Sequence, residues 1–168
     1  MDATELRALQ APLKQRYRED PASARTPVSA TGRVGAAVTF EVDQFPGTTR
    51  AGLHPATGGD GADACSGDML MEALLGCAGV TLRSVATAMG IELRAATGTA
   101  TGAFDARGTL GVDREASVAV QEVEVVFELD TDADDTALEK LAVATERYCV
   151  VGRSLAESPR IVVRRVSG

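Results

Sequence analysis

Tryptophan is absent from this chain, and aromatic residues make up only 4% of it, whereas glycine and alanine are abundant. Large aromatic side chains therefore cannot supply most of the core, and close approach of backbones must contribute to the packing. The chain has a single histidine, His54, and no Cys-x-x-Cys, so the usual Cys/His zinc spacings are excluded. We expect neither a metal nor a tightly bound cofactor.

Basic residues are also in short supply. The chain has 17 lysines and arginines against 24 acidic residues, a net charge of −7, and no basic stripe that would bind nucleic acid. No uncharged apolar run approaches the roughly 18 residues that span a membrane, and the N-terminus lacks the basic-then-apolar pattern of a secretion signal. We therefore expect a cytoplasmic protein without nucleic-acid or membrane partners.

The length of 168 residues suits one domain with a real core, or half of an intertwined dimer. Leucines at spacings of three or four residues predict an amphipathic helix over residues 4–17, with a kink at Pro12. Prolines bound a linker after it. We expect residues 1–27 to form a helical arm with its linker, and residues 28–168 to form the main domain.

A run of short alternating segments predicts about three antiparallel strands over residues 28–53. A long apolar run then begins at the capping residue Ser66, carries Asp68 in its first turn and stops at Gly90. This pattern predicts a core helix. Because apolar residues occupy most of the circumference of this helix, we expect the helix to be buried on several sides.

The second half of the chain predicts two longer strands, over 91–104 and 117–129, with a bulge near 121–122. A helical turn after Gly152 and a final strand over 160–166 are also predicted. The resulting order of elements is typical of an α+β fold. Between the strand over 117–129 and this helical turn, the sequence predicts a helix. The residues of its predicted inner face are Leu138, Leu141, Ala142, Thr145, Tyr148 and Cys149. The acids before it, Asp130, Asp132, Asp134 and Asp135, are better explained by capping and the helix dipole than by metal binding.

Two cysteines, Cys77 and Cys149, occupy apolar faces of predicted helices. Reduced thiols in such a chain are buried filler, metal ligands or redox groups, and a cysteine taken alone is usually inert core. If the fold brings the two together, they form a redox pair. Cys65 lies about 18 Å from Cys77 along a helix, too far for a disulfide, and we interpret it as incidental. His54 is expected in a surface turn.

The residues around both cysteines resemble a known family. Ser66-Gly67-Asp68-Met69-Leu70, followed by Ala73-Leu74-Leu75-Gly76-Cys77, together with Glu146-Arg147-Tyr148-Cys149 and a later Leu155, are similar to the OsmC/Ohr family of osmotically induced and organic hydroperoxide resistance proteins. The resemblance covers roughly residues 28–166. It implies antiparallel sheets wrapped around central helices in an intertwined homodimer, with active sites at the subunit interface.

The resemblance also implies a chemistry. Cys77 would be the peroxidatic cysteine, attacking a peroxide to give a sulfenic acid, and Cys149 would be the resolving cysteine, forming a disulfide that an external dithiol reduces. The implied function is a thiol-dependent peroxidase in oxidative-stress defence, which reduces organic hydroperoxides, and hydrogen peroxide less efficiently. The alternative is a non-enzymatic dimer of the same fold that binds a small molecule or senses thiol oxidation.

Three positions bear on the activation of Cys77, since the middle of a helix supplies no cation or oriented donor by itself. The family's glutamate, ten residues before Cys77, is replaced by Gly67, with Asp68 adjacent as a substitute. The family's activating arginine corresponds to Arg33 or Arg50. The proline that commonly follows the second cysteine in the family is replaced by valine here.

Overall fold

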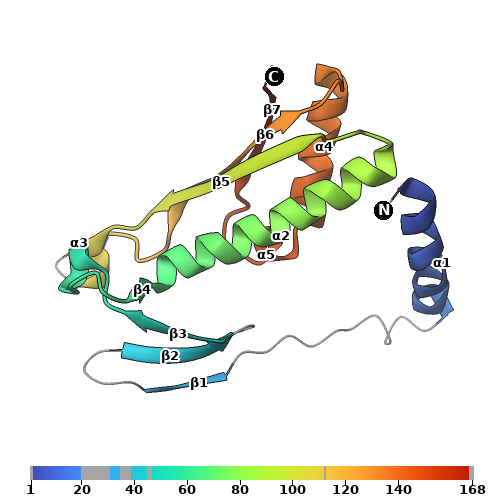
Figure 1. Cartoon of the computed structure of the whole chain (residues 1–168). Coiled ribbons are helices and arrows are strands. Elements are labelled where there is room, and N and C mark those ends of the chain that lie inside the picture. Colours follow the sequence, from blue (N-terminus) through green and yellow to red (C-terminus); the bar gives the residue numbers. More distant parts are fainter. Residues whose placement is uncertain (1, 20–30, 35–38, 45–46, 112, 167–168) are drawn as a thin grey trace. The chain divides into compact units, whose positions relative to one another are not determined.

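The computed structural model describes residues 2–19, 31–34, 39–44, 47–111 and 113–166 (Figure 1). It has the α+β architecture that the sequence predicts. Contacts within the chain divide it into two compact units, which we describe separately. The first unit comprises residues 1–28, 76–99 and 125–168, and the second comprises residues 29–75 and 100–124. The predicted boundary at residue 27 lies outside the described residues and stays a prediction.

Helix α1 (Ala3–Glu19) confirms the predicted N-terminal helix and continues through Pro12. Its start is a reciprocal capping pair. The Asp2 carboxylate accepts the Glu5 N–H at 2.9 Å, and the Glu5 carboxylate accepts the Asp2 N–H at 2.8 Å. This capping box satisfies backbone donors that a helix start leaves free, and so explains where α1 begins.

The second unit contains a sheet of order β1-β2-β3-β4. Its first three strands pair antiparallel, which confirms the three strands expected before residue 53. The fourth strand pairs parallel to β3, with Ala51 opposite Ala64, and was missed because two residues carry no readable alternation. The elements are β1 (Thr31–Val34), β2 (Thr39–Gln44), β3 (Gly47–Gly52), the 3₁₀ turn η2 (Pro55–Thr57), β4 (Ala64–Cys65) and the short helix α3 (Ala106–Thr109).

Helix α2 (Ser66–Met89) has the predicted length and runs through parts of both units. Gly90, at φ +73°, ends it. The Gly90 N–H donates to the Thr87 carbonyl and the Ile91 N–H to the Ala86 carbonyl, which is a Schellman motif. Glycine is favoured there because its backbone is left-handed.

A smaller part of the α2 surface is buried than the sequence predicts. Its fully enclosed side chains form one stripe at four-residue spacing, Leu74, Ala78, Leu82 and Ala86. Val80, in contrast, is 73% exposed, so the prediction of burial on several sides is wrong for the single chain. By length and composition alone α2 is long and apolar enough to cross a membrane, a test that the core helix of a soluble protein also passes.

A second sheet belongs mainly to the first unit, although parts of two of its strands fall in the second. Strands β5 (Ala95–Ala103), β6 (Gln121–Asp130) and β7 (Arg160–Arg165) form a sheet of order β5-β6-β7. Backbone at Glu122 is left-handed, at φ +54°, where the sequence predicts a bulge. A Cβ on Gly79 would lie 3.9 Å from Phe127, so β6 passes close to α2. The buried residues of this unit include Leu82, Val125, Phe127, Leu129, Leu138, Leu141 and Ile161.

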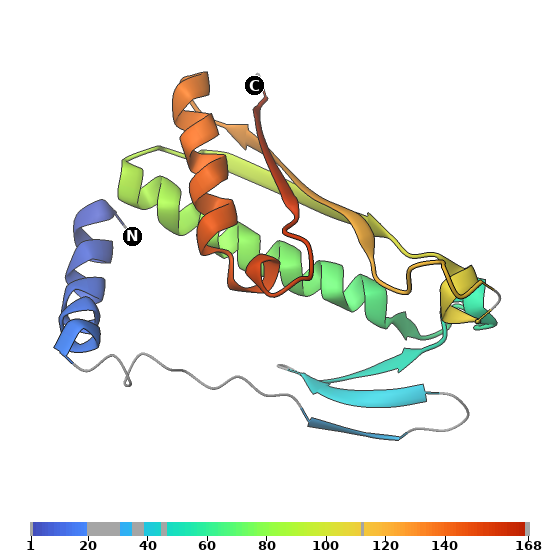
Figure 2. The same cartoon turned by 180° about the vertical axis from the view of Figure 1, so that it is seen from behind.

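Helix α4 (Asp135–Tyr148) contacts β7, as the view from behind in Figure 2 shows. Leu138, Leu141 and Thr145 are buried as predicted, but Tyr148 is 60% exposed and does not belong to the inner face. The helical turn expected after Gly152 instead spans α5 (Val150–Arg153), one residue beyond Cys149. The turn begins there because the backbone of Cys149 leaves the helical region, which ends α4 and allows α5 to start at the next residue.

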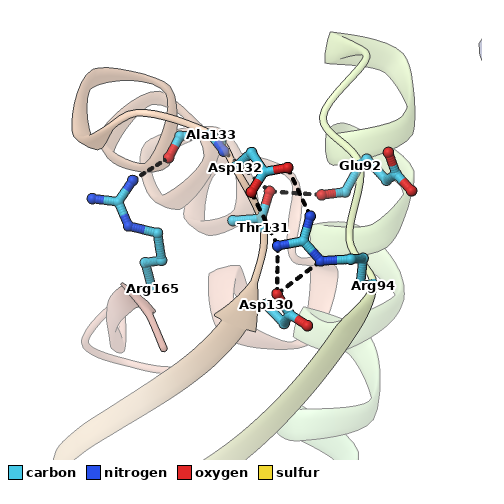
Figure 3. A network of polar contacts seen from close by, with 7 residues as sticks. All are labelled: Glu92, Arg94, Asp130, Thr131, Asp132, Ala133 and Arg165. Carbon is cyan, nitrogen blue, oxygen red and sulfur yellow. Dashed lines mark hydrogen bonds and ion pairs between the residues drawn. The ribbon is translucent and has the colours of Figure 1, made fainter. Parts of the chain in front are cut away.

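A polar network joins the ends of β5 and β6 to the start of α4 (Figure 3). Arg94 donates to the Asp130 carboxylate at 2.6 Å and to Asp132 at 2.8 Å. Asp134 caps α4 by accepting the Ala137 N–H at 2.7 Å. The expectation that all four acids serve the helix start is therefore wrong for Asp130 and Asp132, which bind Arg94. Hydrogen bonding to Arg94 lowers the pKa of Asp132.

Candidate functional site

The first unit brings Cys77 and Cys149 together, at the junction of α4 and α5. Cys149 ends α4, where its N–H donates to the Thr145 carbonyl at 3.0 Å, and it also begins α5. Its sulfur accepts the Gly152 N–H at 3.4 Å and therefore acts as the N-cap of α5. The Cys149 side chain is fully buried, whereas Cys77 is partly exposed. The pair thus has one thiol that solvent reaches and one that it does not.

The sulfur of Cys77 faces the start of α5. Burial alone raises the pKa of Cys77, but hydrogen bonds from the Val151 N–H, the Cys149 thiol, the Val150 N–H and the Thr81 hydroxyl lower it. The outcome is a pKa below the ordinary value for a cysteine. A lowered pKa increases the fraction of thiolate, which is the nucleophilic form.

The pKa of Cys149 shifts in the opposite direction. Burial raises its pKa, the Gly152 N–H opposes that change, and the proximity of Cys77 raises the pKa further. A thiolate on Cys77 and a second one beside it would repel each other, so the proton stays on Cys149. The first proton that the pair loses therefore comes preferentially from Cys77, the more accessible of the two thiols.

Gly152 fits closely against the buried sulfur. A Cβ at this position would lie 3.3 Å from the Cys149 sulfur and 3.1 Å from a ring carbon of Pro159. Glycine therefore lets the backbone N–H of residue 152 approach the sulfur while Pro159 packs on the other side. This contact positions the resolving candidate rather than its partner.

The three charged residues proposed from the sequence belong to the second unit. Arg50, on β3, forms an ion pair with Asp63, so its guanidinium is already neutralised by a carboxylate. Arg33 lies opposite Glu41 in the backbone register of β1 and β2. Its side chain is outside what the structure describes. Asp68 occupies the first turn of α2, nine residues before Cys77, which is a rise of about 14 Å. No contact with Cys77 is described for Arg50 or Asp68, and the role expected for Arg33 stays a prediction.

Sequence reasoning missed the donors that do reach Cys77. Thr81 lies one helical turn beyond it, and its single hydroxyl proton is donated to the Cys77 carbonyl at 2.8 Å, so it reaches the sulfur only by turning away from that carbonyl. A spacing of four residues on a predicted helix was the available signal for Thr81. The N–H groups of Val150 and Val151 had no such signal, because backbone donors leave no mark in side-chain patterns. Gly152, three residues after Cys149, indicated only indirectly that the backbone approaches a sulfur there.

Replacing Val150 by proline tests the backbone donors. Proline is tolerated at the first position of a helix and fits the extended backbone of Cys149, at φ −72° and ψ 105°, but it has no N–H. We expect the pH profile of Cys77 alkylation by iodoacetamide to move to higher pH, with a roughly three- to tenfold slower rate at pH 7. Peptide mapping by mass spectrometry would follow Cys77 alone.

Val150→Ala is the matched control, because it keeps the N–H and truncates a side chain that is 72% exposed. It should leave the profile where it is. An unchanged profile in a folded Val150→Pro protein would contradict the role given to this N–H.

A separate cavity of about 270 Å³ lies within the second unit. Cys65, interpreted from the sequence as incidental, and His54, which lies at a turn as predicted, line it together with Asp68. Among the described residues, no group of three His, Cys, Asp or Glu side chains is arranged to hold a metal ion. The cavity contains neither Cys77 nor Cys149 in its lining.

Comparisons with known proteins agree with this architecture. The chain is similar to a crystal structure of an OsmC-like protein from Mycoplasma pneumoniae, with a TM-score of 0.66 and 14% identity over 84% of this chain and 96% of that one. It is also similar to an organic hydroperoxide resistance protein from Elizabethkingia anophelis, with a TM-score of 0.67 and 12% identity over 84% and 99%.

A third structure, an organic hydroperoxide resistance protein OsmC from Legionella pneumophila, gives a TM-score of 0.61 and 11% identity over 85% and 100%. Identities this low show a shared fold alone. No curated protein matches the chain. The family model for the OsmC-like protein matches residues 59–164, more than half of the sequence. This chain therefore belongs to the family of OsmC-like proteins.

Proposed function

We propose that this protein is a thiol-dependent peroxidase that reduces organic hydroperoxides through Cys77 and Cys149. One observation carries the proposal: an accessible thiol with a lowered pKa lies against a buried thiol with a raised pKa. Family membership, and the similarity to proteins described as organic hydroperoxide resistance proteins, add support. The assignment of Cys77 as the attacking thiol rests on its accessibility and its donors.

The proposed first step is nucleophilic. The Cys77 thiolate attacks one oxygen of the peroxide, so that an S–O bond forms and the O–O bond breaks. The alkoxide that leaves takes a proton from solvent and departs as an alcohol. The N–H groups of Val150 and Val151 hold the thiolate before attack.

The proposed second step closes a disulfide. The Cys149 sulfur attacks the sulfenic sulfur of Cys77, an S–S bond forms, and the hydroxyl leaves as water with the proton that Cys149 gives up. An external dithiol then reduces the disulfide by two exchange steps and is itself oxidised. The reaction needs no metal and no bound cofactor.

Exposed apolar residues beside Cys77 support an organic substrate and a second subunit. Val80, on the next turn of α2, is 73% exposed, and Val150 and Tyr148 are 72% and 60% exposed. Exposed apolar side chains close to a reactive thiol suit contact with an alkyl group or another chain. We propose a homodimer, and light scattering on the purified protein would measure its mass. The cytoplasmic location proposed above suits a site that depends on reduced thiols.

Peroxide consumption in the presence of a dithiol tests the function directly. We expect multiple turnovers with cumene hydroperoxide, and slower turnover with hydrogen peroxide because the apolar surface beside Cys77 contributes nothing to binding the smaller oxidant. Equal rates for both oxidants would remove the support for an organic substrate.

The second candidate function is a binding or thiol-sensing dimer, and it is favoured by Gly67, which offers no carboxylate where the family has glutamate. Stoichiometric oxidation of the two cysteines without cycling would support the sensor. A folded protein whose thiols do not react with peroxide would support the binding protein.

A further inference from the structure

The cavity in the second unit presents a third thiol that the peroxidase chemistry does not use. Cys65, on β4, lines it together with His54, Asp68, Met71 and Phe104. At about 270 Å³ the cavity is below the usual size of sites for drug-sized ligands, so it suits a small molecule. The same cavity thus combines a nucleophile, an imidazole and a carboxylate with apolar walls.

The imidazole of His54 is held in one orientation. Its Nδ1 accepts the Ala56 N–H at 3.0 Å, and its ring meets Phe104 edge to face, with 5.3 Å between centroids. The His54 carbonyl also accepts the N–H groups of Thr57 and Gly59. Because Nδ1 is occupied as an acceptor, the neutral ring carries its proton on Nε2 and acts as a donor. His54 therefore offers a fixed N–H group rather than a base.

The carboxylates at the cavity give it negative charge, and no lysine or arginine in its described lining opposes them. Asp68 contributes a carboxylate, and a neighbouring cavity that shares Asp68 adds Glu72. No lysine or arginine is among the described residues that line either cavity. Such a lining attracts a small cation with an apolar part and repels an anion of the same size.

We propose that Cys65 is a mixed-disulfide site for small disulfides that carry ammonium groups. The Cys65 sulfur, as its thiolate, attacks one sulfur of the disulfide, so that a new S–S bond forms and the original one breaks. The other half leaves as a thiolate, which the His54 N–H can hydrogen-bond and which takes a proton from water. The thiol proton of Cys65 goes to solvent, and no further oxidant is consumed. This modification does not depend on peroxide reduction at Cys77.

The test compares three disulfides of similar size: cystamine, which is cationic, bis(2-hydroxyethyl) disulfide, which is neutral, and dithiodiglycolate, which is anionic. The full chain with Cys77→Ser and Cys149→Ser leaves Cys65 as its one thiol, and serine keeps an N-cap oxygen for α5. Intact mass gives the adduct and its rate. A melting curve establishes that the variant is folded, and peptide mapping of the reduced wild-type protein repeats the measurement without substitutions.

Each rate is divided by the rate of the same chain unfolded in urea, which removes the intrinsic reactivity of each disulfide. We expect the folded protein to favour cystamine over dithiodiglycolate by about tenfold at low salt, with the neutral disulfide between them. The preference should shrink at high salt. It should also shrink by about threefold in Asp68→Asn, but not in Glu157→Gln, which removes an exposed carboxylate that is not among the residues lining the cavity.

Two results would overturn the proposal. One is a charge preference that is the same in the folded and unfolded chains. The other is a folded protein in which Cys65 forms no adduct although it does so in urea.

Discussion

Cys77→Ser should lower peroxide turnover by about three orders of magnitude or more, because serine has no accessible anionic form at neutral pH. The serine hydroxyl would occupy the same place beside the N–H groups of Val150 and Val151, so the loss would report chemistry rather than folding. Consumption of cumene hydroperoxide with excess dithiol is the measurement. A folded Cys77→Ser protein with wild-type turnover would contradict the assignment of the attacking thiol.

Cys149→Ser is the informative contrast. This variant keeps the attacking thiol, so one equivalent of peroxide per chain should still be consumed in a burst. Cycling should then become slow, because the sulfenic acid on Cys77 has no neighbouring thiol with which to form a disulfide. Intact mass would detect Cys77 with one added oxygen, or its adduct with a sulfenic-acid reagent. Wild-type cycling in Cys149→Ser would contradict the resolving role.

The largest stability effect is expected at Leu141, which is completely buried on the inner face of α4. Leu141→Ala removes apolar contacts and leaves a cavity, at a cost of about 2–5 kcal/mol in the free energy of unfolding. The matched control is Val143→Ala on the same helix, since Val143 is 68% exposed, and it should change the stability by about 0.5 kcal/mol or less.

Urea unfolding of both variants at one protein concentration would measure the difference between them. Equal destabilisation by the two substitutions would show that α4 is not packed as described.

Much of the fold follows from local signals in the sequence. Ser66, Asp68 and Gly90 predicted α2 because capping and a left-handed glycine mark helix ends independently of the rest of the chain. The three strands before residue 53 alternate clearly enough to be read. Tyr148 was misassigned because helical periodicity places it near the inner face, whereas the chain leaves the helix immediately afterwards, at Cys149.

The candidate site was predictable only in part, and for a physical reason. Cys77 and Cys149 could be picked out through the residues around them, but their proximity depends on how α2 packs against the α4–α5 junction. Activation of Cys77 was sought among the arginines and a carboxylate, whereas the donors that reach it include backbone N–H groups. Those groups belong to every residue except proline, so no side-chain pattern could reveal which of them point at a sulfur.

The unequal burial of the two sulfurs sets a kinetic constraint on the return half of the proposed cycle. In thiol–disulfide exchange the better leaving group is the thiol of lower pKa, which is Cys77 here. Attack that expels Cys77 must occur at the Cys149 sulfur, which solvent does not reach. Attack at the sulfur of the partly exposed Cys77 must instead expel Cys149, the poorer leaving group. Either route is hindered, so oxidation of this protein should be fast and its re-reduction slow.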